Sequence, residues 1–125
     1  MIARPSAVLP FLLLLLGSPI AGAAGLPVFE SDPQADRWLR EQCPGYRRLA
    51  ETVDRHGGYT IDRTAEYPGG VAYFKEGRGY IGLNDALKGA HRVSVLLFEM
   101  TNLYQEGRHQ EVAHRVRRGE LNDPA

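Results

Sequence analysis

The strongest periodic pattern of apolar residues lies in the C-terminal half of the chain. From His91 to about Gln105, apolar side chains recur at intervals of three and four residues: Val93, Leu96, Leu97, Met100, Leu103 and Tyr104. This spacing places them on one face of an α-helix. We therefore predict a central core helix over this stretch. Gly107 is expected to end it, and Val112, Ala113 and Val116 then predict a separate closing helix over residues 109–118.

Two shorter helices are predicted in the N-terminal half. Ser31-Asp32-Pro33 combines a capping side chain with a proline in the first turn, which is typical of a helix start. The first helix is expected over residues 33–42 and is interrupted at Cys43-Pro44-Gly45. A second helix over residues 45–56 places its apolar side chains on one face, and Gly57-Gly58 terminates it.

The middle of the chain changes to strand-like runs. Residues 59–61 predict the start of a strand, and residues 62–70 a loop. Val71–Phe74 and Tyr80–Leu83 flank a segment whose glycines permit the positive φ angles of a turn, which predicts a β-hairpin. A short helical turn, capped by Asn84 or Asp85, is expected up to Lys88 and ends at Gly89. The predicted fold is a small single α+β domain with two N-terminal helices, a β-hairpin, a central core helix and a closing C-terminal helix.

The first residues have the pattern of a secretory signal peptide. A basic start with Arg4 precedes an apolar run over residues 8–16, which is too short to span a bilayer. Ala21-Gly22-Ala23 fits the small-x-small cleavage rule, so we expect residues 1–23 to be removed before Ala24 and residues 24–125 to form the domain. The expected location is the periplasm, with no stable membrane insertion after cleavage.

Charge and cysteine content narrow the classes of function. Arg4 is the only charged residue in the predicted signal, so the remaining 102 residues carry 14 basic and 15 acidic side chains. A nearly neutral chain with interspersed charges argues against nucleic acid as a partner, because phosphate binding requires clustered Lys and Arg. Cys43 is the only cysteine and is expected to be a small buried apolar residue.

One carboxylate, Glu99, interrupts the apolar segment Leu96–Leu103. The amide of Asn102 is three residues on and can reach Glu99 on the same helix face, so the two residues form a short polar strip with Thr101. Two interpretations are open. The strip either faces a partner and supplies specificity, or it forms a polar network in the core, since a buried carboxylate persists only when it is paired or hydrogen-bonded.

The segment around Glu99 resembles a zinc peptidase helix that lacks its ligands. In the motif His-Glu-x-x-His, two histidines bind zinc and the glutamate is the general base. With Glu99 aligned to that base, Phe98 and Asn102 stand at the two ligand positions. With Tyr80–Asn84 as the preceding strand, residues 71–104 resemble the minimal core of zincin-like metallopeptidases. The resemblance implies the fold of this core without its metal site, so no cofactor is expected.

The four histidines do not restore a metal site. His109 and His114 are five residues apart, which separates them by about 140° around a helix axis. They therefore do not share a helix face as a pair of ligands.

Small exported proteins with such a frame also resemble periplasmic immunity proteins, which protect a bacterium against toxins delivered by type VI secretion. In size, predicted signal and character the chain is similar to the immunity partner of a metallopeptidase toxin carried on a secretion spike protein. This resemblance implies a non-catalytic protein whose partner is a toxin. The alternatives are an exported hydrolase that uses Glu99 as acid or base, and a structural envelope protein.

Aromatic residues concentrate around the predicted hairpin: Tyr59, Tyr67, Tyr73, Phe74 and Tyr80. Tyrosine is enriched at protein interfaces. Core packing against the central helix and exposure to a partner are equally open for these rings. The candidate binding residues are therefore Tyr73, Phe74, Tyr80 and Arg78 from the hairpin, together with Glu99, Thr101 and Asn102.

Overall fold

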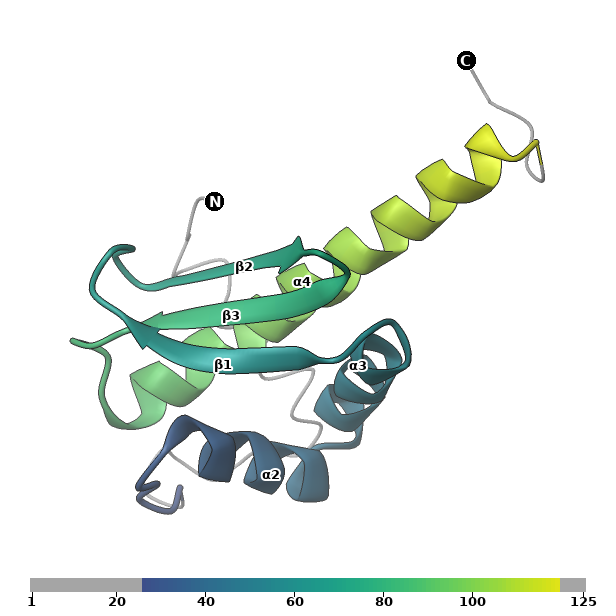
Figure 1. The fold of residues 1–125 in the computed structure, drawn as a ribbon. Helices are drawn as coiled ribbons and strands as arrows, with labels where there is room; N and C mark the ends of the chain where they lie inside the picture. Colours follow the sequence, from purple (N-terminus) through teal and green to yellow (C-terminus); the bar gives the residue numbers. More distant parts are fainter. Residues whose placement is uncertain (1–25, 120–125) are drawn as a thin grey trace.

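The computed structural model describes residues 26–119. The predicted signal peptide lies outside the described residues. The elements follow one another in the order α2 (Asp32–Gln42), α3 (Pro44–Arg55), β1 (Tyr59–Thr64), β2 (Gly70–Lys75), β3 (Arg78–Asn84) and α4 (Gly89–Arg117). The predicted α+β class and the two N-terminal helices are confirmed (Figure 1).

Local signals determine where α2 and α3 begin. The Ser31 hydroxyl accepts a hydrogen bond from the backbone N–H of Gln34 at 3.2 Å, which caps α2 as the sequence predicts. Proline occupies the first turn of both helices, where its missing N–H costs nothing. Cys43 lies between the helices and is buried, as expected.

The three strands form a mixed sheet in the order β1-β3-β2. The predicted hairpin is confirmed: β2 pairs antiparallel with β3. Its turn residues Glu76 and Gly77 have φ angles of 54° and 79°, as in a type I′ turn, whose twist matches that of the flanking strands. The strand predicted from Tyr59 extends to Thr64 and runs parallel to β3 along its other edge.

The predicted closing helix is wrong, because α4 is one continuous helix of 29 residues that runs through Gly107. A Cβ at Gly107 would lie 3.4 Å from two carbons of the Phe74 ring, so the glycine lies where this ring packs against the helix. The C-terminal half of α4 extends past the sheet in Figure 1.

The predicted helical turn up to Lys88 is also wrong. The capping role predicted for Asn84 is confirmed, because its side chain accepts a hydrogen bond from the N–H of Ala86 at 2.9 Å, but the chain forms only a local turn there. Gly89, expected to end a helical turn, is the first residue of α4.

The core lies between α4 and one face of the sheet, and α3 packs on another side of α4. Because alternate side chains of a strand point to opposite faces, the fully buried Ile81 and Leu83 of β3 belong to the covered face. Figure 1 shows α4 crossing behind the sheet, with no described helix in front of it. The opposite face of the sheet is therefore uncovered by the described elements.

Two polar networks connect the layers. Asp32 at the start of α2 accepts two hydrogen bonds of 2.6 Å from Arg92 of α4. Asp36 of α2 accepts hydrogen bonds from the hydroxyls of Tyr46 and Tyr59, the second at 2.7 Å. These contacts link α2 to α4, to α3 and to the edge strand β1.

Candidate functional site

The structure separates the candidate binding residues into two groups. Glu99 and Thr101 of α4 are buried, and Asn102 is partly buried beside them. Tyr73, Tyr80 and Arg78 lie on the uncovered face of the sheet, whereas Phe74, next to Tyr73, points to the covered face. The structure thus does not bring the seven residues together into one site.

The polar strip of α4 lies in the core. Thr101 donates its hydroxyl hydrogen bond to the carbonyl of Leu97 in the same helix at 3.0 Å. The Asn102 amide donates to Oε1 of Glu99 at 3.2 Å, which is the contact that the spacing predicts. Glu99 is 0 % exposed, and its Oε2 has no hydrogen-bond partner among the described residues. This placement agrees with the core interpretation of the strip.

Glu99 packs directly against the backbone of β2. A Cβ at Gly70 would lie 2.8 Å from Cγ and 2.9 Å from Oε2 of Glu99, so only a glycine leaves room for the carboxyl group. Burial raises the pKa of Glu99 to about 7, against the opposing effect of the hydrogen bond from Asn102. Such a pKa suits an acid or base, but a general acid or base must also lie within hydrogen-bond reach of a substrate. A substrate does not reach a fully buried group without displacing β2 or α4.

No metal site or membrane-spanning helix is found in residues 26–119. Within this range, no three or more His, Cys, Asp or Glu side chains are grouped so as to hold a metal ion. None of the helices described there combines the length and the apolar character needed to cross a membrane.

The uncovered side of the sheet carries an aromatic surface, here called the tyrosine face. Strand register places Tyr80 of β3 between Tyr73 of β2 and Thr60 of β1. The rings of Tyr73 and Tyr80 lie 4.9 Å apart between centroids, and Tyr73 is 37 % exposed. Tyr67, in the loop between β1 and β2, is also 37 % exposed. Val71, in the next row of β2, completes the tyrosine face.

Side chains of the tyrosine face pack closely over Gly82. A Cβ at Gly82 would lie 3.0–3.2 Å from side-chain atoms of Val71, Tyr80 and Thr64. The Tyr80 ring and its neighbours thus close over the glycine, and a ring that covers a strand glycine compensates for its missing side chain. Tyr67 is held by Asn84 of β3, whose amide donates to the Tyr67 carbonyl at 2.6 Å. Neither Gly82 nor Asn84 carries a sequence signal for this role, because both roles depend on strand register.

The five aromatic residues divide between the two alternatives that the sequence left open. Tyr59 is partly buried and bonds to Asp36, and Phe74 covers Gly107 of α4. Both belong to the covered side. Tyr67, Tyr73 and Tyr80 belong to the tyrosine face.

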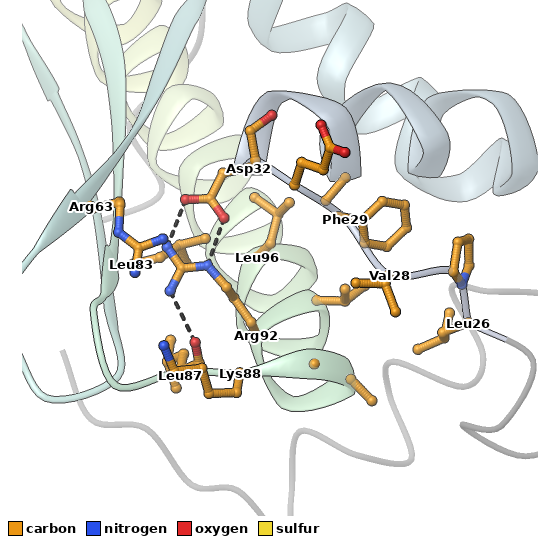
Figure 2. A pocket seen from close by; sticks show the side chains of 17 residues that line it. Leu26, Val28, Phe29, Asp32, Arg63, Leu83, Leu87, Lys88, Arg92 and Leu96 are labelled. Carbon is orange, nitrogen blue, oxygen red and sulfur yellow. Dashed lines mark hydrogen bonds and ion pairs between the residues drawn. The ribbon is translucent and has the colours of Figure 1, made fainter.

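A cavity of about 360 Å³ lies on the covered side of the sheet, between residues 26–31 and the start of α4 (Figure 2). Apolar side chains of β3 and α4, including Leu83 and Leu96, form part of its lining. Figure 2 shows Arg92 beside it, bonded to Asp32. Arg92 also donates to the carbonyls of Asn84 and Leu87, so its guanidinium group is engaged in holding the fold.

Comparison with protein-family models, curated proteins and solved structures finds no match to this chain. The assignment of function therefore depends on the chemistry of the surfaces described above. The tyrosine face offers contact area and hydroxyl groups on a rigid strand surface, which is suited to binding. The buried carboxyl group of Glu99 is titratable, but a substrate does not reach it.

Proposed function

We propose that this protein is an exported, non-catalytic binding protein that neutralises a secreted toxin by direct contact in the periplasm. The observation that carries the proposal is the tyrosine face. Exposed tyrosine rings contribute contact area at a small entropic cost, and their hydroxyls tolerate the wet rim of an interface. Strands position these rings more rigidly than a loop does.

Two features of the sequence support a location in the periplasm and a toxin as the partner. The predicted signal peptide directs the chain across the inner membrane. The resemblance to periplasmic immunity proteins of type VI secretion, in particular to partners of metallopeptidase toxins, supplies the class of partner. Under this proposal the protein acts stoichiometrically and needs no cofactor.

An exported hydrolase that uses Glu99 is the alternative from another class of function. Full burial of Glu99 against Gly70 speaks against it, since a substrate has no path to the carboxyl group. The carboxyl group instead has a role in the packing of α4 on β2.

Survival of cells that produce candidate periplasmic toxins tests the proposal. Cells with the full chain should survive a toxin that is neutralised, and cells with a version that lacks residues 1–23 should die, because a cytoplasmic copy does not meet its target. The Glu99→Gln variant should protect like the wild type when both are folded and exported. Loss of protection by Glu99→Gln that no increase in dose restores would instead support the enzyme.

A further inference from the structure

The tyrosine face has charged groups of opposite sign at its two ends. Asp62 of β1 lies opposite Gly82, in the row next to Tyr80, and Glu66 lies in the loop beside Tyr67. Lys75 and Arg78 face each other at the hairpin end. None of these four side chains forms an ion pair with another residue in the range 26–119 that the structure describes. Their charges are therefore available to a partner.

Strand register places Asp62 on the strand next to Tyr80, one row away, and Glu66 immediately precedes Tyr67 in the chain. Burial raises the pKa of the Tyr80 hydroxyl, and the negative charges of Asp62 and, more weakly, Glu66 raise it further. Both charges thus act at the position of this ring. Glu66 is also held in place, because its N–H donates to the Thr64 hydroxyl at 3.1 Å.

Aromatic faces and carboxylates attract the same kind of group. A tyrosine ring attracts a cation through its negative π face, and carboxylates pair with the same cation. We propose that the partner presents a lysine or arginine side chain that lies over Tyr80 and Tyr73 and pairs with Asp62 and Glu66. This inference rests on the proposed function and adds the chemistry by which the partner is recognised. An uncharged apolar partner would leave both carboxylates without a counter-charge.

Backbone NMR of the isotope-labelled protein tests this with a defined probe, N-acetyl-arginine methylamide, against the neutral analogue N-acetyl-citrulline methylamide. The arginine compound should shift the amide signals of Tyr73, Tyr80 and Gly82 and bind about threefold more tightly than the citrulline compound, the ratio expected for an exposed cation–π contact. Equal responses to the two compounds, or shifts confined to other parts of the protein, would overturn the proposal.

Charge variants provide the matched comparison. Asp62→Asn with Glu66→Gln should weaken binding of the arginine compound and bring it closer to that of the citrulline compound, because only the cation–π contact with the rings remains. Glu41→Gln with Glu51→Gln removes the same charge from exposed positions of α2 and α3 and should leave binding unchanged. Unchanged binding by the Asp62 and Glu66 variant would refute the role of these carboxylates.

Two further outcomes would contradict the proposal. Shifts of the same amides by an N-acetylglucosamine trimer, without a response to the arginine compound, would assign the face to carbohydrate. A dimer in solution that Tyr73→Ala dissociates would assign it to a second copy of the chain.

The inference and the proposed function fail in different ways. If the arginine compound binds as expected but the exported protein protects against no toxin, the proposed function fails. If Tyr73 and Tyr80 are needed for protection but the Asp62 and Glu66 variant protects like the wild type, the charge recognition fails and the proposed function stands.

Discussion

At the scale of single residues, Glu99 is the carboxyl group that the core buries with an oxygen atom unpartnered among the described residues. Its carboxyl group is fully buried, has one hydrogen bond from Asn102, and presses against Gly70. An ionised carboxylate in such a place costs free energy unless it is paired. The folded state therefore favours the protonated form, which is the origin of the raised pKa.

This predicts a pH dependence that belongs to Glu99. The pKa is about 7 in the folded state, against 4.5 as its ordinary value, so the folded state binds the proton more tightly than the unfolded chain. The stabilisation is complete below the ordinary value and is lost as the pH rises through about 7. Wild type should lose on the order of 2–3 kcal/mol relative to Glu99→Gln between these limits, since each unit of pKa is worth about 1.4 kcal/mol.

Urea unfolding of both proteins at pH 5 and pH 8 measures this difference. Glu51→Gln, at an exposed position of α3, is the control and should follow the wild type at both pH values. If the difference between wild type and Glu99→Gln is the same at pH 5 and pH 8, Glu99 is not the buried titrating group.

The residues of the tyrosine face show which properties of single residues a sequence pattern predicts and which it does not. The concentration of aromatic residues around the hairpin was visible in the sequence. Which rings are exposed was not, because Tyr73 and Phe74 are neighbours and the strand sends them to opposite faces. That choice depends on where α4 packs, which lies far along the chain.

At the scale of elements, local sequence signals give the wrong end for α4. A glycine after an apolar repeat is a common helix end, and Gly107 fits this pattern. In the structure the Phe74 ring packs close to this glycine, and the helix continues to Arg117. The glycine at this position is thus explained by a tertiary contact with β2. The apolar pattern of the helix sequence gives no information on that contact.

Gly107→Ala distinguishes the two helix descriptions. Inside a continuous helix, alanine should raise the free energy of unfolding by up to about 1 kcal/mol, less the cost of a 3.4 Å approach to Phe74. Gly77→Ala is the comparison, because its φ of 79° in the hairpin turn makes alanine unfavourable there by about 1 kcal/mol. Urea unfolding measures both. A loss for Gly107→Ala as large as that for Gly77→Ala would indicate that the helix ends at residue 107.

The sheet shows the same division between local and non-local information. The hairpin joins residues that are close in sequence, and its turn glycine is a clear signal. The parallel pairing of β1 with β3 places Tyr59 beside Gly79, although all of β2 lies between them in the sequence. The alternation of Tyr59–Thr64 carries no information on which strand it joins, so the three-stranded order was not predicted.

At the scale of the whole molecule, the Asp32–Arg92 pair joins the start of α2 to the start of α4. The side chains of this pair are 8 % and 13 % exposed. Removing one partner of a buried pair leaves the other charge uncompensated, which costs about 3 kcal/mol. This is a large part of the stability of a small domain.

Asp32→Asn should therefore lower the free energy of unfolding by about 3 kcal/mol. Asp85→Asn breaks the pair with Arg63, whose side chains are more than half exposed, and should cost less than about 1 kcal/mol. Thermal and urea unfolding of both variants test the difference. Similar small losses for both would mean that the ends of α2 and α4 are not held together by this pair.

The central claim is that the tyrosine face is the surface that binds the proposed toxin partner. The most direct test is the dissociation constant of the purified protein for a toxin that it neutralises. Tyr73→Ala with Tyr80→Ala should weaken binding at least tenfold, or about 1.4 kcal/mol, as expected when interface tyrosines are truncated. Val112→Ala, which removes a side chain 42 % exposed on the far end of α4, should bind like the wild type. An unchanged dissociation constant for the folded tyrosine variant would contradict the account.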